Sequence, residues 1–100
     1  MKLAEYQDIA YRSYFGNTLP VREQLINNAL GLTGEAGEVV DQVKKEIYLN
    51  RVLPREELVE ELGDTLWHLA VLASARGICL EEVATYNIEK LKGRYPDAKW

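Results

Sequence analysis

The longest helical pattern in the chain is VREQLINNALGLTGEAGEVVDQVKKEIY, residues 21–48. Apolar residues recur in it at intervals of four and three, which is typical of a helix packed lengthwise against its neighbours. We expect the buried seam to consist of Leu25, Ala29, Leu32, Ala36, Val39, Val43 and Ile47. Gly31, Gly34 and Gly37 each cost about 1 kcal/mol relative to alanine inside a helix. They indicate either a weak or locally broken helix or a neighbour that approaches the backbone closely.

Three further helices are predicted around this one. The first covers about residues 2–14 and is followed by a turn at Gly16-Asn17. The next opens at Pro54 and ends near Arg76-Gly77, where a cation precedes a terminating glycine. The last covers about residues 80–94, and its start should be less well fixed than a serine cap would make it, because Cys79 is a poor capping residue. No segment alternates apolar and polar residues long enough to predict a strand, so the fold class is all-α.

Composition limits the class of protein. A length of 100 residues predicts a single domain, residues 1–100, with a modest core. With 12 basic against 16 acidic residues, the chain lacks the basic surface that binds nucleic acid polymers. A single cysteine excludes an internal disulfide framework. No apolar run approaches the roughly 20 residues that span a bilayer, and no signal peptide is visible, so we expect a soluble cytoplasmic protein.

Two pairs of carboxylates carry most of the chemical information. Glu35 and Glu38 lie three residues apart on one predicted helix, and Glu61 and Asp64 on the next, so each pair shares a helix face. If the two helices pack antiparallel, all four side chains can converge at the edge of their interface. Such an arrangement is repulsive unless a divalent cation binds, and oxygen-only ligands suit Mg²⁺ or Mn²⁺. The alternative is an ordinary solvated face of acidic residues.

Other candidate groups are less distinctive. A di-iron carboxylate bundle would need Glu-x-x-His motifs, and the one histidine, His68, follows Asp64 by four residues. We therefore expect His68 to be a packed or hydrogen-bonded side chain rather than a ligand. Asn87, Lys90 and Arg94 form one polar stripe that could hold phosphate oxygens, or could equally be a solvated helix face.

The arrangement of the two acid pairs resembles a known family. Glu35-x-x-Glu38, a gap of 22 residues and Glu61-x-x-Asp64 are similar to the signature of the MazG-like all-α nucleoside triphosphate pyrophosphohydrolases. The surrounding stretches GEAGEVVD (34–41), EELGDTLWH (60–68) and NIEKLKGRYP (87–96) extend the resemblance over about residues 20–96.

The resemblance implies a four-helix bundle-type protomer completed by a second subunit, as a homodimer or a tetramer. It implies Mg²⁺-dependent hydrolysis of a nucleoside triphosphate, with non-canonical nucleotides and deoxynucleotides included, to the monophosphate and pyrophosphate. By position, Glu35, Glu38, Glu61 and Asp64 would bind the metal and form the catalytic group, with one glutamate deprotonating the attacking water. Asn87 and Lys90, and with them Arg94, would contact substrate phosphates.

Two alternatives stay open at this point. The stretch WHLAVL (67–72) is also similar to the phosphoribosyl-ATP pyrophosphohydrolases, which cut the same bond in another substrate. A different class is a non-catalytic helical dimerisation module whose acids are surface charge. In either case Ile26 and Leu30, which lie off the main seam, are candidate contacts for another subunit.

Overall fold

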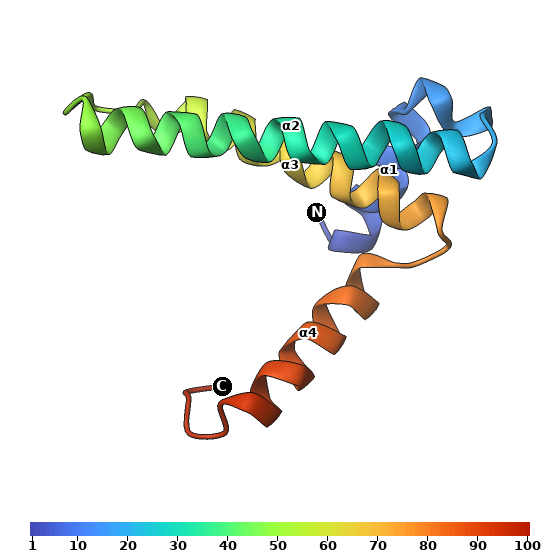
Figure 1. The fold of residues 1–100 in the computed structure, drawn as a ribbon. Coiled ribbons are helices and arrows are strands. Elements are labelled where there is room, and N and C mark those ends of the chain that lie inside the picture. Colours follow the sequence, from blue (N-terminus) through green and yellow to red (C-terminus); the bar gives the residue numbers. More distant parts are fainter.

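The computed structural model describes all of residues 1–100 and contains helices but no strand (Figure 1). Its elements are α1 (Leu3–Ser13), a 3₁₀ turn η1 (Phe15–Thr18), α2 (Val21–Tyr48), α3 (Arg55–Ala75) and α4 (Leu80–Arg94). The four expected helices are therefore confirmed, and α2 and α4 have the expected ends. None of these helices combines the length and the apolar character needed to cross a membrane.

Helices α2 and α3 lie side by side and run antiparallel (Figure 1). Two hydrogen bonds mark the register, because Gln42 of α2 reaches Glu61 near the start of α3, whereas Asn28 reaches His68 further along it. Helix α1 packs mainly against α3. The buried core sits at that end of the molecule and consists of Ala10, Ala70, Val71, Ala73 and Leu80.

The expected seam of α2 is only partly correct. Leu25, Leu32 and Val39 are half-buried, but the other four members of the predicted seam, Ala29, Ala36, Val43 and Ile47, are exposed. The inward face is instead shared with polar residues, of which Gln24 and Asn28 are the most buried.

Hydrogen bonds explain how Gln24 can occupy the interior. Its amide donates to the carbonyls of Leu19 and Asn17 and accepts the Tyr11 hydroxyl at 2.9 Å. A buried polar group that is fully bonded carries little penalty. The α2 helix is therefore anchored to η1 and α1 by a polar contact that apolar periodicity does not reveal.

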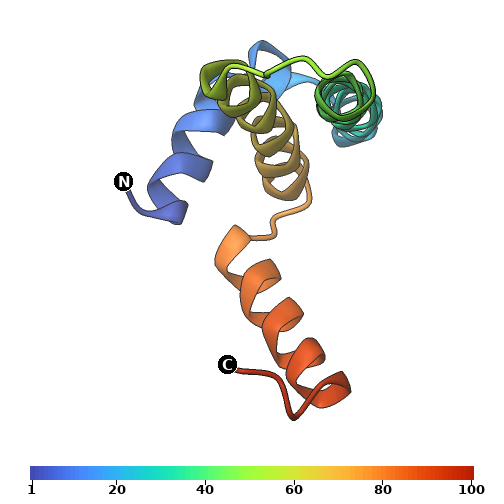
Figure 2. The same cartoon turned by 90° about the vertical axis from the view of Figure 1, so that its left-hand side faces the viewer.

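Helix α4 leaves the body of the protein and points away from the α2–α3 pair in both views (Figures 1 and 2). Its main packing is against α1, and only Leu80 is buried. Val83, Tyr86 and Ile88 are all more than two fifths exposed. Most of the apolar surface of α4 is therefore without a partner in a single chain. An isolated helix of this length is only marginally stable in water, so α4 would gain stability if that surface were covered.

The three glycines of α2 behave differently from one another. The helix continues through all of them, which rules out the local break. A methyl group at Gly31 would overlap the His68 ring, whereas Gly34 and Gly37 have no neighbouring atom within 4 Å of that position. Of the two alternatives, the close approach of a neighbour is therefore present at Gly31 only, and the approaching group is an imidazole.

The end of α3 is set by the expected glycine. Gly77 has a φ of +69°, the Ile78 N–H donates to the Ala73 carbonyl at 2.9 Å, and the Gly77 N–H donates to the Ser74 carbonyl. This pair of bonds is the Schellman motif, which requires a left-handed residue where glycine stands.

Replacing Gly77 with alanine should destabilise the fold by about 1–2 kcal/mol, because a side chain strains the left-handed backbone. Urea denaturation measures this difference. Gly93→Ala is the matched control, because Gly93 is helical and nothing lies within 4 Å of its missing side chain. The control should stabilise α4 by up to about 1 kcal/mol. Equal effects of the two substitutions would contradict this reading of the turn.

Candidate metal centre

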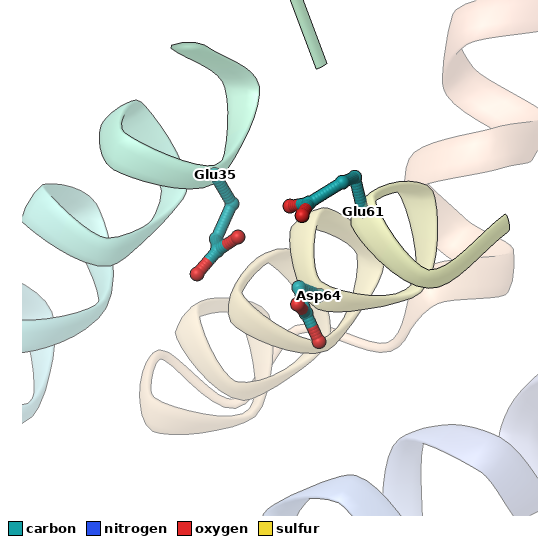
Figure 3. Close-up of side chains that lie close together, drawn as sticks. All are labelled: Glu35, Glu61 and Asp64. Carbon is teal, nitrogen blue, oxygen red and sulfur yellow. The ribbon is translucent and has the colours of Figure 1, made fainter. Parts of the chain in front are cut away.

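Three of the four predicted carboxylates meet between α2 and α3. Each of Glu35, Glu61 and Asp64 offers one oxygen, and these oxygens all lie within 4.8 Å of one another. Figure 3 shows Glu35 on one helix directed toward Glu61 and Asp64 on the other. Glu35 and Glu61 are half-buried, and Asp64 is exposed, so the group is open to a ligand from solvent.

The helix register brings these residues together. Glu61 and Asp64 are three residues apart, so they occupy one face of α3. The antiparallel packing then places Glu35 of α2 opposite that face. The short connection from Leu49 to Pro54 holds the two helices as antiparallel neighbours. The convergence that we expected at the edge of the helix interface is present for these three side chains.

Glu38 lies outside this close group. It is exposed and contributes no oxygen to the three-residue cluster, although its charge is near enough to act on Glu61. The structure thus brings Glu38 to the rim of the centre rather than into it. Any metal contact of Glu38 would require its flexible side chain to turn inward.

Electrostatics single out Glu61 within the group. Desolvation raises the pKa of Glu61 above its usual value, and the carboxylate of Glu35 raises it further. Glu38 and Asp64 act in the same direction. Mutual repulsion is the cost of placing these side chains together, and a divalent cation would relieve it.

The donor set fits a hard cation. All three side chains offer carboxylate oxygens, with no sulfur and no imidazole among them, which is the chemistry that Mg²⁺ and Mn²⁺ prefer. A buried oxygen adds to this, because Oε1 of Gln42 has no hydrogen-bond partner while its amide nitrogen donates to Glu61 at 3.4 Å. The centre can therefore hold a divalent ion between α2 and α3.

Two neighbours of the centre were missed from sequence. Tyr6 of α1 lies near Asp64, since burial and then the Asp64 charge raise the pKa of its phenol. Gln42, which lies two turns of α2 beyond Glu35, contacts Glu61. Tyr6 fitted the apolar face of α1, and Gln42 stands among charged residues, so neither carried a distinguishing local signal. Only the helix packing places them here.

His68 has the structural role that we expected. Its Nδ1 lies 3.1 Å from Oδ1 of Asn28, whose own amide donates to the Gln24 carbonyl. Nδ1 therefore carries the proton in this bond. The ring also meets Trp67 edge-on, with centroids 5.0 Å apart. His68 is a packed and hydrogen-bonded side chain one helical turn beyond Asp64, outside the metal group.

The predicted phosphate-binding residues lie elsewhere. Asn87 and Lys90 sit together on α4, where they line a shallow pocket with Val83 and Tyr86. Arg94 ends the same helix and does not line that pocket. Because α4 points away from α2 and α3, a single chain keeps these three residues apart from the carboxylates (Figure 2).

Replacing Glu61 with glutamine should raise the melting temperature measured without metal at neutral pH, because it removes a repelled charge. The raised pKa means that the folded protein keeps the Glu61 proton to higher pH than the unfolded chain does. Stability should therefore fall as pH rises from the ordinary glutamate pKa through the raised one, and the variant should lose this pH dependence.

The same substitution should abolish stabilisation by Mn²⁺. Glu60→Gln is the control, since Glu60 is exposed on the same helix and belongs to no cluster. Melting curves with and without Mn²⁺, across pH, provide the measurement. A Glu61 variant that is less stable without metal than the parent would show that repulsion does not dominate this site.

The sequence of this chain is similar to that of known proteins. A model of the MazG nucleotide pyrophosphohydrolase domain matches residues 23–99. "Gene 37 protein" of Mycobacterium phage L5 is 39% identical over 69 residues, which are 65% of this chain and 60% of that protein. "Uncharacterized protein YvdC" of Bacillus subtilis (strain 168) is 34% identical over 76 residues, which are 67% of this chain and 72% of that protein.

The chain thus spans about 60% of the phage relative and about 72% of the Bacillus relative. No solved structure matches it. The family match includes α3, α4 and nearly all of α2, and with them all four acids of the signature. The family resemblance seen in the sequence is confirmed: the chain belongs to the MazG nucleotide pyrophosphohydrolase domain family.

Proposed function

We propose that this protein is a Mg²⁺-dependent nucleoside triphosphate pyrophosphohydrolase that releases a nucleoside monophosphate and pyrophosphate. The observation that carries the proposal is the meeting of Glu35, Glu61 and Asp64 between α2 and α3, in a chain of the MazG family. The substrate class is a nucleoside triphosphate, including non-canonical and deoxynucleotides. Mn²⁺ can substitute for Mg²⁺ because the donors are all oxygens.

The protein's own groups have two tasks in this reaction. Glu35, Glu61 and Asp64, joined by Glu38 from the rim, hold the metal, and one glutamate accepts a proton from the attacking water. When bound, Mg²⁺ supplies charge neutralisation for the triphosphate and makes the water more acidic. The water oxygen bonds to the α phosphorus, and the bond between that phosphorus and the oxygen that bridges the α and β phosphates breaks. Pyrophosphate takes the bridging oxygen with its electron pair.

A panel of nucleoside triphosphates incubated with the protein and Mg²⁺ tests the reaction. Chromatography should show a monophosphate and pyrophosphate in equal amounts. Asp64→Asn should lower kcat at least about a hundredfold, because metal ligands supply several kcal/mol of transition-state stabilisation. Glu60→Gln should keep full activity. Release of orthophosphate would contradict the proposed cut, and full activity of the Asp64 variant would remove it from the centre.

We also propose that the working form is a homodimer. A large part of the apolar surface is uncovered in one chain, including Ile26, Leu30, Leu62, Leu66 and Leu69 on α2 and α3. The separated helix α4 has an exposed apolar face of its own. Burying such faces against a second copy would complete the bundle and stabilise α4. In that assembly, Asn87, Lys90 and Arg94 of one subunit would reach the carboxylates of the other.

Mixing two inactive variants tests this shared site. In the proposed dimer, each site takes its carboxylates from one subunit and its Lys90 from the other. Asp64→Asn removes the first contribution and Lys90→Ala the second, so each variant alone should be nearly inactive. After unfolding and refolding together, half of the dimers should be mixed, and about a quarter of the wild-type activity should return. Mixing Asp64→Asn with Glu61→Gln is the control and should restore nothing. No recovery in the first mixture would contradict a site shared between subunits.

The substrate panel also separates the alternatives. A phosphoribosyl-ATP pyrophosphohydrolase would cut the same bond but would leave ordinary nucleoside triphosphates intact. A non-catalytic dimerisation module would show neither turnover nor stabilisation by Mn²⁺. The half-buried acids Glu35 and Glu61 weigh against that module. Acids that served only as surface charge would repel one another and would be more stable apart and in water.

A further inference from the structure

Gln7 of α1 is a polar side chain in the core whose bonds tie three elements together. It is 7% exposed. Its amide nitrogen donates to the Ser74 hydroxyl at 3.0 Å and to the Ile78 carbonyl at 2.8 Å. Its amide oxygen accepts the backbone N–H of Leu80 at 2.8 Å. One amide therefore joins α1 to the end of α3, to the following turn and to the first residue of α4.

One of these bonds, the one from Leu80, stands in for a missing helix cap. Cys79 stands at the capping position of α4 and makes no side-chain hydrogen bond there. The N–H groups of the first turn of a helix have no partner within the helix, and Gln7 satisfies the one at Leu80. As expected, Cys79 supplies no cap, and the bond at the start of α4 comes instead from a helix more than seventy residues away in the sequence.

We propose that Gln7 is a positioning residue that sets the direction in which α4 leaves the body. Only Leu80 of α4 is buried, so little besides Leu80 and the Gln7 bond holds the N-terminal end of the helix, which we call its root. Lys90 lies ten residues further along, about 15 Å from the root at the rise of an α-helix. A tilt of about 10° at the root would move it by roughly 2.5 Å over that length.

A shift of this size matters for the proposed chemistry, and this step rests on the proposed function. Misplacing a substrate-binding group by about 1 Å can cost a hundredfold in rate. Gln7 bonds to none of the carboxylates between α2 and α3. Loss of Gln7 should therefore impair binding of the triphosphate by α4 while leaving the metal centre intact.

Three variants test the proposal in the full-length protein. Gln7→Met keeps the length of the side chain and removes all three bonds, whereas Gln7→Glu keeps the acceptor for Leu80 and loses both donors. Ser74→Ala removes one bond only and serves if the first two fail to fold. Glu5→Gln is the matched control, since Glu5 is an exposed residue of the same helix.

Each variant is compared with the parent in three measurements. Amide exchange at Leu80, followed by NMR, should be about tenfold faster in Gln7→Met, in line with one lost hydrogen bond. KM for the triphosphate should rise about tenfold or more, because α4 no longer presents its polar face in place. Affinity for Mn²⁺ alone should stay within about twofold of the parent, as the centre is untouched. The control should match the parent throughout.

Unchanged Leu80 exchange and unchanged KM in Gln7→Met would overturn the proposal. So would a loss of Mn²⁺ affinity equal to the change in KM, because that pattern marks general damage to the fold.

If the parent hydrolyses no triphosphate, the proposed function fails and a distance measurement decides the role of Gln7. Spin labels at Glu60→Cys on α3 and Glu89→Cys on α4 report the distance between these helices, in a Cys79→Ala background diluted with unlabelled protein. A shifted or broadened distance distribution in Gln7→Met supports the positioning role, and an unchanged one overturns it.

Discussion

Repulsion among Glu35, Glu61 and Asp64 is the constraint on which the rest of this structure depends. Their oxygens lie within 4.8 Å of one another, and burial together with the neighbouring carboxylates raises the pKa of Glu61. Packing of α2 against α3 must outweigh the repulsion among these carboxylates, and hydrogen bonds at Gln42 and at Asn28 mark the register of that packing. A divalent cation between these carboxylates would offset their mutual repulsion. The same geometry therefore links the cost of this arrangement to its capacity for metal.

The second feature of the molecule is the separation between its two sets of polar groups. The carboxylates lie on α2 and α3, whereas Asn87 and Lys90 lie on α4, which leans away (Figure 1). Apolar side chains such as Leu66 on α3 and Tyr86 on α4 are uncovered in one chain, and the proposed homodimer rests on them. Gln7, at the N-terminal end of α4, belongs to this geometry because in our proposal it sets the direction of that helix.

Much of this arrangement could be predicted from sequence, and the failures have physical causes. Helix ends followed from prolines and from Gly77, and the acid pairs followed from their spacing. The inward face of α2 was wrong in part, because apolar periodicity cannot show that Gln24 and Asn28 are bonded well enough to be buried. Gln42 and Tyr6 near the centre depend on contacts between helices. The direction of α4 depends on a cap from α1, which no local pattern near Cys79 reveals.

The central claim is that Glu35, Glu61 and Asp64 form a metal centre for a triphosphate. The most direct test is a crystal of the protein grown with Mn²⁺ and a triphosphate analogue that cannot be cut between its α and β phosphates. An anomalous difference map identifies manganese independently of the protein atoms. The account predicts a peak among the three carboxylates, in contact with phosphate oxygens. A bound analogue with no manganese between α2 and α3, or with manganese only elsewhere, would contradict it.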